Sequence, residues 1–200
     1  MKNNCVAIIP ARGGSKRIYK KNIKNFLGVP AIHRVIDKII SFGMFDQIIV
    51  TTDDQEICKV IDKYSDIVVV MRPKAISNDY ATTVEAISHA IENITSLDIL
   101  PEYVCCIYPC SVFIQKQDLQ DGLELLKSKN IEFTYPVAEY SHPIQRAVTI
   151  NKDGYIEMNE PEYELTRTQD LEKTFHDVGQ FYWGHVRSWL VNKRLHSNAA

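Results

Sequence analysis

The sequence predicts a three-layer α/β fold in which helices cover both faces of a mostly parallel sheet. Short apolar runs rich in β-branched and aromatic residues alternate with amphipathic stretches of helical period, and the connections between them are short. This alternation is typical of parallel sheets, because each parallel strand needs a crossover connection to reach the next. The chain has 200 residues, 45% of them hydrophobic, which is enough for one globular domain with a substantial core.

Five segments have the composition expected of strands. They are Cys5–Pro10, Gln47–Thr52, Asp66–Met71, Tyr103–Tyr108 and Phe133–Val137. Ligands of open parallel sheets bind beyond the carboxyl ends of the strands. The loops that follow the first four strands are therefore expected to share one rim and to carry the functional residues.

Four segments between these strands are predicted to be helices. They are Pro30–Phe42, Asp53–Tyr64, Thr82–Ile94 and Gln117–Ser128. In the first of them, isoleucine and valine side chains recur on one face, as expected for a helix that packs on a sheet. The second opens with two carboxylates, which suit the positive end of a helix dipole.

After about Val137 the pattern changes to short strands and turns. Within a single domain formed by residues 1–200, residues 139–168 are predicted to form a β-rich excursion with a hairpin turn at Asn151–Gly154. Two interpretations of the excursion stay open. It is either a small lobe or dimerisation arm, or a simple surface hairpin.

Composition and charge exclude several classes of protein. The formal net charge of −2 and the sequence pI near 6.3 argue against a nucleic-acid partner. No apolar run reaches the length of a membrane-spanning helix, so no membrane association is expected. The five cysteines are odd in number and lack the paired CxxC spacing of a zinc site. We therefore expect a cytoplasmic protein with reduced thiols.

The loop after the first predicted strand, Ala11 to Asn22, is unusually basic for a nearly neutral protein. Its glycines, Gly13 and Gly14, would let the backbone turn tightly and approach an anion. The loop lacks the GxxxxGK[ST] pattern of P-loops and the GxGxxG pattern of dinucleotide sites. Cationic side chains are therefore expected to carry the phosphates of a ligand. The alternative is a solvated basic loop, because five spread charges repel one another only weakly in water.

Several segments together resemble the sugar-acid cytidylyltransferases, the enzymes that make CMP-sialic acid and related compounds. The segments are ARGGSKR followed by KKN, then IIVTTDD, RPKAISNDYATTVE and YPCSVF, in the order found in that family. YPCSVF stands where the family usually has QPTSP. The later segments SHPIQRA and TRTQDLEKTFHDVGQFYWG are most similar to the branch that activates pseudaminic acid. The resemblance covers nearly the whole chain and implies a Rossmann-like nucleotidyltransferase fold.

The resemblance implies a nucleotide site on the first and third loops of the rim. Arg12, Lys16 and Lys21 would hold the triphosphate and act in catalysis, beside Ala11, Ser15 and the Gly13 and Gly14 amides. Asn22 and Arg72 would contact the ribose and cytosine, and the nucleoside pocket would be completed by Asp79, Thr82 and Thr83. For Asp79 and Thr82, capping of the following helix is an equally good interpretation.

The resemblance also implies a sugar-acid site. Its predicted residues are Tyr108, Ser111, Gln145, Arg146, Arg167, Gln169 and His176. Arg146 would reach the sugar site of a partner subunit in a homodimer, with a plain surface position as the alternative. His176 and Asp177 are either a catalytic pair or, as we prefer, a hydrogen-bonded structural pair.

The implied reaction is transfer of CMP from CTP to a nine-carbon sugar acid, with release of pyrophosphate and with Mg²⁺ as cofactor. N-acetylneuraminic, legionaminic and 3-deoxy-manno-octulosonic acids are the rival acceptors to pseudaminic acid. The acidic C-terminal segment IDxxxD that helps to hold Mg²⁺ in the family is not found before the sequence ends at RLHSNAA, so no metal ligands are predicted. A CTP-binding module with weak catalysis is therefore the alternative to an active synthetase.

Overall fold

The structure, a computed structural model, describes residues 3–95, 101–191 and 194–196. The chain divides into two compact units. The first comprises residues 1–136 and 179–200, and the second comprises residues 137–178, which include the predicted excursion. Within the described residues, no helix combines the length and the apolar character needed to cross a lipid bilayer.

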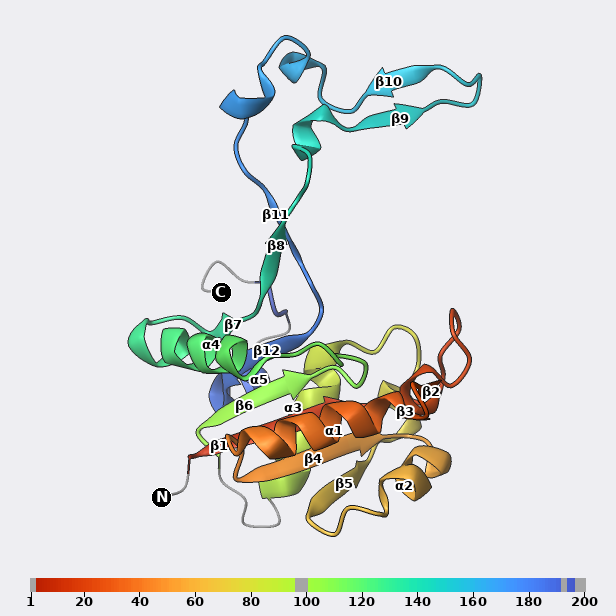
Figure 1. The fold of residues 1–200 in the computed structure, drawn as a ribbon, viewed down its shortest axis with the longest axis vertical. Helices are drawn as coiled ribbons and strands as arrows, with labels where there is room; N and C mark the ends of the chain where they lie inside the picture. The colour runs from red at the N-terminus through yellow and green to blue at the C-terminus, as the bar shows by residue number, and fades with distance from the viewer. Residues whose placement is uncertain (1–2, 96–100, 192–193, 197–200) are drawn as a thin grey trace. The chain divides into compact units, whose positions relative to one another are not determined.

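A six-stranded sheet forms the centre of the first unit (Figure 1). Its strands, in spatial order, are β5 (Ile67–Met71), β4 (Gln47–Thr52), β1 (Cys5–Pro10), β6 (Tyr103–Ile107), β12 (Phe181–His185) and β7 (Phe133–Thr134). The first four are mutually parallel, whereas β12 runs antiparallel to both of its neighbours. The prediction of a mostly parallel sheet is confirmed.

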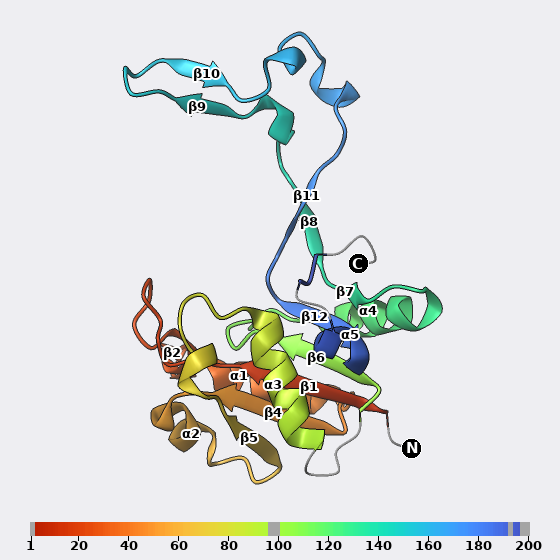
Figure 2. The same ribbon diagram turned by 180° about the vertical axis from the view of Figure 1, so that it is seen from behind.

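Helices cover both faces of this sheet, as predicted. On one face lie α1 (Ala31–Phe42), α2 (Gln55–Ile61) and α4 (Lys116–Ser128), and on the other lie α3 (Thr83–Thr95) and α5 (Val186–Val191) (Figures 1 and 2). Successive strand residues point to opposite faces, so Ala7 belongs to the first apolar cluster and Val6 to the second. Two separate cores therefore hold the helices to the sheet.

Two buried tryptophans anchor the helices near β12. The indole nitrogen of Trp183 donates to the backbone oxygen of Leu119 at 3.0 Å, and that of Trp189 donates to the backbone oxygen of Val104 at 3.2 Å. Both rings are fully buried, and each polar N–H group has the partner that burial requires. These bonds fix α4 and α5 against the sheet on opposite faces.

Some elements differ from the sequence-based prediction. The predicted strand at residues 133–137 is divided into β7 and β8 (Val137–Glu139), because Pro136 between them has no N–H group to continue a ladder. The helix expected from Asp53 begins at Gln55, since Asp54 is its N-cap and accepts from Glu56 N at 2.7 Å. The strand β12 and the helix α5 were not predicted.

A short hairpin, β2 (Asn25–Phe26) with β3 (Val29–Pro30), leads from the basic loop into α1. Its two turn residues, Leu27 and Gly28, both have positive φ, 51° and 87°. This is the geometry of a tight two-residue turn. The hairpin therefore fixes where the chain leaves the loop, through the hydrogen bond from Ala31 N to Lys24 O at 3.0 Å.

The second unit contains two antiparallel pairs of strands. β8 pairs with β11 (Phe175–Asp177), and β9 (Val148–Ile150) pairs with β10 (Ile156–Met158). The turn between β9 and β10 is closed by Gly154 N donating to Asn151 O at 3.0 Å, with Gly154 at φ 84°. The predicted hairpin turn is confirmed.

Candidate active site

The carboxyl ends of four parallel strands bring together the loops that carry most of the predicted site. β1, β4, β5 and β6 are parallel neighbours, so the loops beginning at Ala11, Asp53, Arg72 and Tyr108 lie at one edge of the sheet. Ala11 is buried, and its N–H donates to Thr51 O at 2.9 Å, which joins the first two loops. The predicted rim is therefore present.

Gly13 lies where the basic loop approaches the loop after β4. Its N–H donates to Oδ1 of Asp53 at 2.9 Å. A Cβ atom at Gly13 would lie 2.8 Å from the Cβ of Asp54, closer than real Cβ contacts, whereas a Cβ at Gly14 would meet no atom within 4 Å. Ser15 N donates to Gly13 O at 2.9 Å and closes a tight turn. Glycine is therefore required by close packing at position 13 and not at position 14.

Arg12 and Lys16 converge on one carboxylate, that of Asp79. Nη2 of Arg12 lies 2.8 Å from Oδ1 of Asp79, and Nζ of Lys16 is paired with Oδ2. Nη1 of Arg12 also donates to Asn78 O at 2.9 Å. Lys16, which contributes most, and Arg12 hold the pKa of Asp79 below its usual value. Two of the predicted phosphate ligands are thus already adjacent and aimed at an anion.

The remaining cations of the basic loop differ in whether they form an ion pair. Lys20 is paired with Glu56 in the first turn of α2, and this hydrogen bond raises the pKa of Lys20. Arg17 and Lys21 are exposed, and neither forms an ion pair with another residue in the described part of the chain. Lys21 is therefore free to meet a phosphate without breaking an existing contact.

Asn22 holds the basic loop to the rest of the rim. Its side chain is buried, with 4% of the residue exposed, and Nδ2 donates to Arg12 O at 2.9 Å. The thiol of Cys110 lies 3.7 Å from Oδ1 of Asn22. The Asn22 amide thus links the two ends of the loop and touches the loop after β6.

Arg72 is a buried cation at the end of β5. Only 8% of the residue is exposed, and burial lowers the pKa of its guanidinium, with Asp53 acting in the opposite direction. Nη2 donates to Thr51 O at 2.9 Å, while Nε is buried and meets no hydrogen-bond acceptor among the described residues. The buried Arg72 side chain thus joins the end of β5 to β4 through Thr51.

Thr82 and Thr83 occupy the start of α3. Thr82 forms a capping box with Glu85: its N–H and hydroxyl bond the Glu85 carboxylate at 2.7 and 2.9 Å, and Glu85 N donates back to Oγ1 at 3.2 Å. Thr83 Oγ1 lies 2.9 Å from the hydroxyl of Tyr108. The capping interpretation of Thr82 thus has direct geometric support, whereas Asp79 caps no helix and pairs with cations.

On the predicted sugar side of the rim, Tyr108 and Ser111 are tied to the residue before β12. Tyr108 N and Ser111 Oγ both donate to Gln180 O, at 3.0 and 2.9 Å. Ser111 is buried, and its hydroxyl already has an acceptor. The loop after β6 is therefore held in place by backbone contacts that the sequence pattern did not reveal.

The other predicted sugar-site residues belong to the second unit. Nη1 of Arg146 donates to three carbonyl oxygens, those of Tyr163, Glu164 and Thr166, at 2.9 to 3.3 Å. Gln145 donates to Glu172 O at 3.3 Å, while Arg167, Gln169 and His176 are exposed. His176 Nδ1 lies 3.1 Å from the backbone oxygen of Asp177, and its ring packs edge-on against Tyr140.

The carboxylates at the rim do not form a ready metal site. Across residues 3–95, 101–191 and 194–196, no group of three or more histidine, cysteine, aspartate or glutamate side chains is placed to hold a metal ion. Asp53 and Asp79, which face the basic loop, are engaged by the Gly13 amide and by Arg12 and Lys16. The described residues thus offer no preformed magnesium cage.

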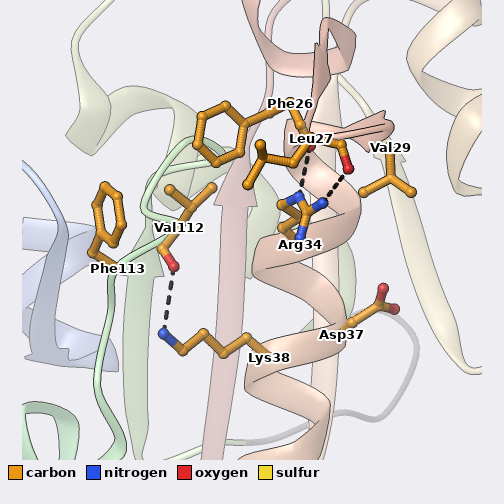
Figure 3. A pocket seen from close by; sticks show the side chains of 8 residues that line it. All are labelled: Phe26, Leu27, Val29, Arg34, Asp37, Lys38, Val112 and Phe113. Atoms are coloured by element: carbon orange, nitrogen blue, oxygen red, sulfur yellow. Dashed lines mark hydrogen bonds between the residues drawn. The ribbon is translucent and has the colours of Figure 1, made fainter.

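A groove of about 490 Å³ lies beside the rim (Figure 3). It is lined by Phe26, Leu27, Val29, Arg34, Asp37, Lys38, Val112 and Phe113. Arg34 donates to Phe26 O at 2.7 Å and Lys38 donates to Val112 O at 3.4 Å. The two cationic side chains of the groove therefore hold backbone carbonyl groups. None of the predicted site residues lines this groove.

The sequence analysis missed two acidic residues of the rim. Asp53 binds the Gly13 amide, and Glu56 pairs with Lys20. A signal was available, because the two aspartates that follow the second strand belong to the same rim as the basic loop. From sequence alone these aspartates favour a helix N-terminus and belong to the family-like segment IIVTTDD, but neither pattern identifies a partner for them.

Comparisons with known proteins identify the family of this chain. The family model described as cytidylyltransferase matches residues 6–181. The pseudaminic acid cytidylyltransferase of Campylobacter jejuni strain 81-176 is 40% identical over 190 residues, which cover 95% of this chain and 81% of that protein. The enzyme of the same name from C. jejuni strain NCTC 11168 is 38% identical over the same shares.

A solved structure resembles the fold. The CMP:2-keto-3-deoxy-manno-octonic acid synthetase in complex with CTP superposes with a TM-score of 0.68 over 92% of this chain and 75% of that chain, at 17% identity. At this identity the likeness concerns the fold alone. The predicted nucleotidyltransferase fold is thereby confirmed.

Proposed function

This chain belongs to the cytidylyltransferase family, and we propose that it transfers CMP from CTP to a nine-carbon sialic-acid-like sugar acid, releasing pyrophosphate. Pseudaminic acid is the proposed acceptor, because the relatives at 38% and 40% identity are pseudaminic acid cytidylyltransferases. The observation that carries the proposal is the convergence of Arg12 and Lys16 on one anion, at a rim where Lys21 forms no ion pair with any described residue.

The proposed chemistry needs positioning and charge neutralisation. The anomeric hydroxyl of the sugar acid attacks the α-phosphorus of CTP and gives up its proton to solvent, the new phosphate ester forms, and the bond between the α- and β-phosphates breaks to release pyrophosphate. Arg12, Lys16 and Lys21 would offset the negative charge that gathers on the leaving pyrophosphate. No covalent enzyme nucleophile is required. We assign no protein ligand to the Mg²⁺ that the family resemblance implies.

The nucleoside is proposed to lie between the ends of β1 and β5. Arg72 supports this assignment best, because it places a cationic hydrogen-bond donor at the end of β5 and cytosine offers a carbonyl oxygen. Asn22 and Thr83 would contact the nucleoside from the first and third loops. Thr82 would act mainly through the start of α3, where it forms the capping box.

The sugar acid is proposed to meet Tyr108 and Ser111 at the end of β6. Gln145, Arg146, Arg167, Gln169 and His176 of the second unit remain proposed sugar ligands. The guanidinium of Arg146 already donates to three carbonyl groups of its own unit, so these hydrogen bonds compete with binding of a sugar. Arg167 and Gln169 are exposed and remain available for a carboxylate or an acylated amine.

A homodimer is also proposed, with the second unit as its contact. The register of β9 and β10 places Ile150 opposite Ile156 and Val148 opposite Met158, so all four side chains share one face. Ile150 and Ile156 are 73% and 70% exposed. A two-stranded hairpin with an uncovered apolar face favours association with another surface.

Pyrophosphate release tests the activity. The purified chain is incubated with CTP, Mg²⁺ and pseudaminic acid, and parallel reactions contain N-acetylneuraminic, legionaminic or 3-deoxy-manno-octulosonic acid. We expect acceptor-dependent pyrophosphate release that is greatest with pseudaminic acid. Release with another acid alone would correct the substrate, and no release with any acid, alongside intact folding, would refute the enzyme assignment.

A further inference from the structure

Asp79 uses both carboxylate oxygens to hold the basic loop. Oδ1 pairs with Nη2 of Arg12 at 2.8 Å, and Oδ2 pairs with Lys16. The neighbouring carbonyl of Asn78 accepts from the other terminal nitrogen of Arg12 at 2.9 Å. The segment after β5 thus presents a carboxylate and a carbonyl to two side chains assigned to the triphosphate.

These contacts are exchangeable. The side chains of Asp79 and Lys16 are 37% and 80% exposed. Ion pairs in such surroundings are weak, because water screens them and two flexible side chains must be ordered. An anion of higher charge can therefore replace the carboxylate without unfolding the rim.

We propose that Asp79 is an internal anion that stands in for the triphosphate when no nucleotide is bound. This inference rests on the proposed function and assigns Asp79 a different role from the nucleoside contact implied by family resemblance. A triphosphate accepts hydrogen bonds from both cations and carries several charges, whereas the carboxylate carries one. The two anions cannot share Arg12 and Lys16 without repulsion, so nucleotide binding displaces Asp79.

The displacement has two consequences for binding. Asp79 keeps Arg12 and Lys16 side by side in the free protein, and it also weakens the apparent affinity for every anion that needs both cations. Removing its charge should therefore strengthen phosphate binding. If Asp79 instead contacts the nucleoside, removing its charge should not tighten phosphate binding, because that contact would be to the base or ribose and not to the phosphate chain.

Binding of inorganic tripolyphosphate, followed by isothermal titration calorimetry, separates these roles because this probe has no nucleoside. We expect Asp79→Asn to bind tripolyphosphate about three- to tenfold more tightly than the natural chain, as the loss of weak competing ion pairs implies. Asp79→Glu should keep the natural affinity within about twofold, since the charge is retained. Asp62→Asn, which removes an exposed carboxylate at the end of α2, controls for the change in net charge.

Unchanged or weaker tripolyphosphate binding by Asp79→Asn would overturn the inference, provided that thermal unfolding shows the variant to be folded. Equal gains in Asp79→Asn and Asp62→Asn would also overturn it, because they would reflect net charge alone. Failure of all the proteins to bind tripolyphosphate would do the same. A gain specific to Asp79→Asn in a protein that releases no pyrophosphate would leave the inference intact and refute only the proposed enzyme activity.

Discussion

The hydroxyl groups of Thr83 and Tyr108 lie 2.9 Å apart, which joins the first residue of α3 to the end of β6. Thr83 belongs to the predicted nucleoside pocket and Tyr108 to the predicted sugar site. The ring of Tyr108 also packs against Tyr182 of β12, with centroids 5.4 Å apart. This bond thus fixes two loops that the proposed reaction must align.

A double-mutant cycle tests whether this bond stabilises the rim. Thr83→Val and Tyr108→Phe each remove a hydroxyl group and keep the shape of the side chain. We expect a coupling free energy of about 0.5 to 1.5 kcal/mol between them in urea unfolding, the usual net value of a hydrogen bond. Additive effects of the two substitutions would show that the bond contributes nothing.

Lys21 is expected to be the strongest single contributor to CTP binding among the loop lysines, because within the described part of the chain it has no ion pair that a phosphate would have to break. Lys21→Ala should weaken CTP binding about 10- to 100-fold, as the loss of one charge-assisted hydrogen bond implies. Calorimetric titration with CTP measures the change.

Arg17→Ala is the matched control for Lys21→Ala. Arg17 lies in the same loop, is exposed and is likewise without an ion pair among the described residues, but no phosphate role is assigned to it. Its removal should change CTP affinity less than about threefold, as expected for a screened charge at a distance. Similar losses in both variants would mean that the loop acts through its overall charge and not through Lys21.

The two loop glycines should respond differently to alanine. Gly13→Ala would place a methyl group 2.8 Å from the Cβ of Asp54, so either the loop or the start of α2 must shift. We expect a loss of stability of about 1 to 3 kcal/mol, as for other overpacked sites. Gly14→Ala, which meets no atom within 4 Å, should unfold at nearly the natural temperature. Equal melting temperatures in thermal unfolding followed by circular dichroism would contradict this assignment.

The capping box formed by Thr82 and Glu85 should make part of the folding stability depend on pH. Hydrogen bonds from the backbone and hydroxyl of Thr82 lower the pKa of Glu85 from its usual 4.5. Because the pKa is lower in the folded state, this stabilisation is present above pH 4.5 and is lost as pH falls through the folded-state pKa. Thr82→Ala should cost about 1 kcal/mol at pH 7, with a smaller effect in acid.

Urea unfolding of Thr82→Ala and Thr82→Ser at pH 7 and at acidic pH measures this contribution. Thr82→Ser retains the hydroxyl and should remain close to the natural protein. A stability loss in Thr82→Ala that stays constant as Glu85 is protonated would argue against the capping box. Strong loss of CTP binding in Thr82→Ala, with stability unchanged, would instead favour direct contact of the Thr82 hydroxyl with the nucleoside.

The sheet and its rim could be predicted because they follow from local patterns. The apolar runs at Cys5–Pro10 and Gln47–Thr52 coincide with β1 and β4. Parallel order then fixes which loop ends meet, whatever their side chains. The family resemblance, drawn from motifs on those loops, is confirmed by the match over residues 6–181.

Other features depend on partners that local patterns do not identify. β12 enters the sheet antiparallel between β6 and β7, and a short apolar run carries no information about its neighbours. The pairing of Arg12 with Asp79 joins residues from the first and third rim loops, and charge alone does not select Asp79 over Asp53. The position of the rim could therefore be predicted from the sequence. The side-chain pairs within it could be identified only from the structure.

The apolar face of the β9–β10 hairpin gives a test of dimerisation. Ile150 and Ile156 lie opposite each other and are largely exposed within the chain. Replacing both by threonine keeps β-branched side chains, so the hairpin should form, but it removes apolar surface from a contact. Each substitution should cost the contact about 1 kcal/mol, and a symmetric dimer contains each of them twice.

Light scattering after size-exclusion chromatography should therefore show a dimer for the natural chain and a monomer for the Ile150→Thr, Ile156→Thr variant. Thr149→Ser changes the opposite, polar face of β9 and should leave the dimer intact. If the double variant remains dimeric at micromolar concentration, the hairpin face is not the contact. A monomeric natural chain would refute the proposed homodimer and favour the interpretation of this segment as a simple surface hairpin.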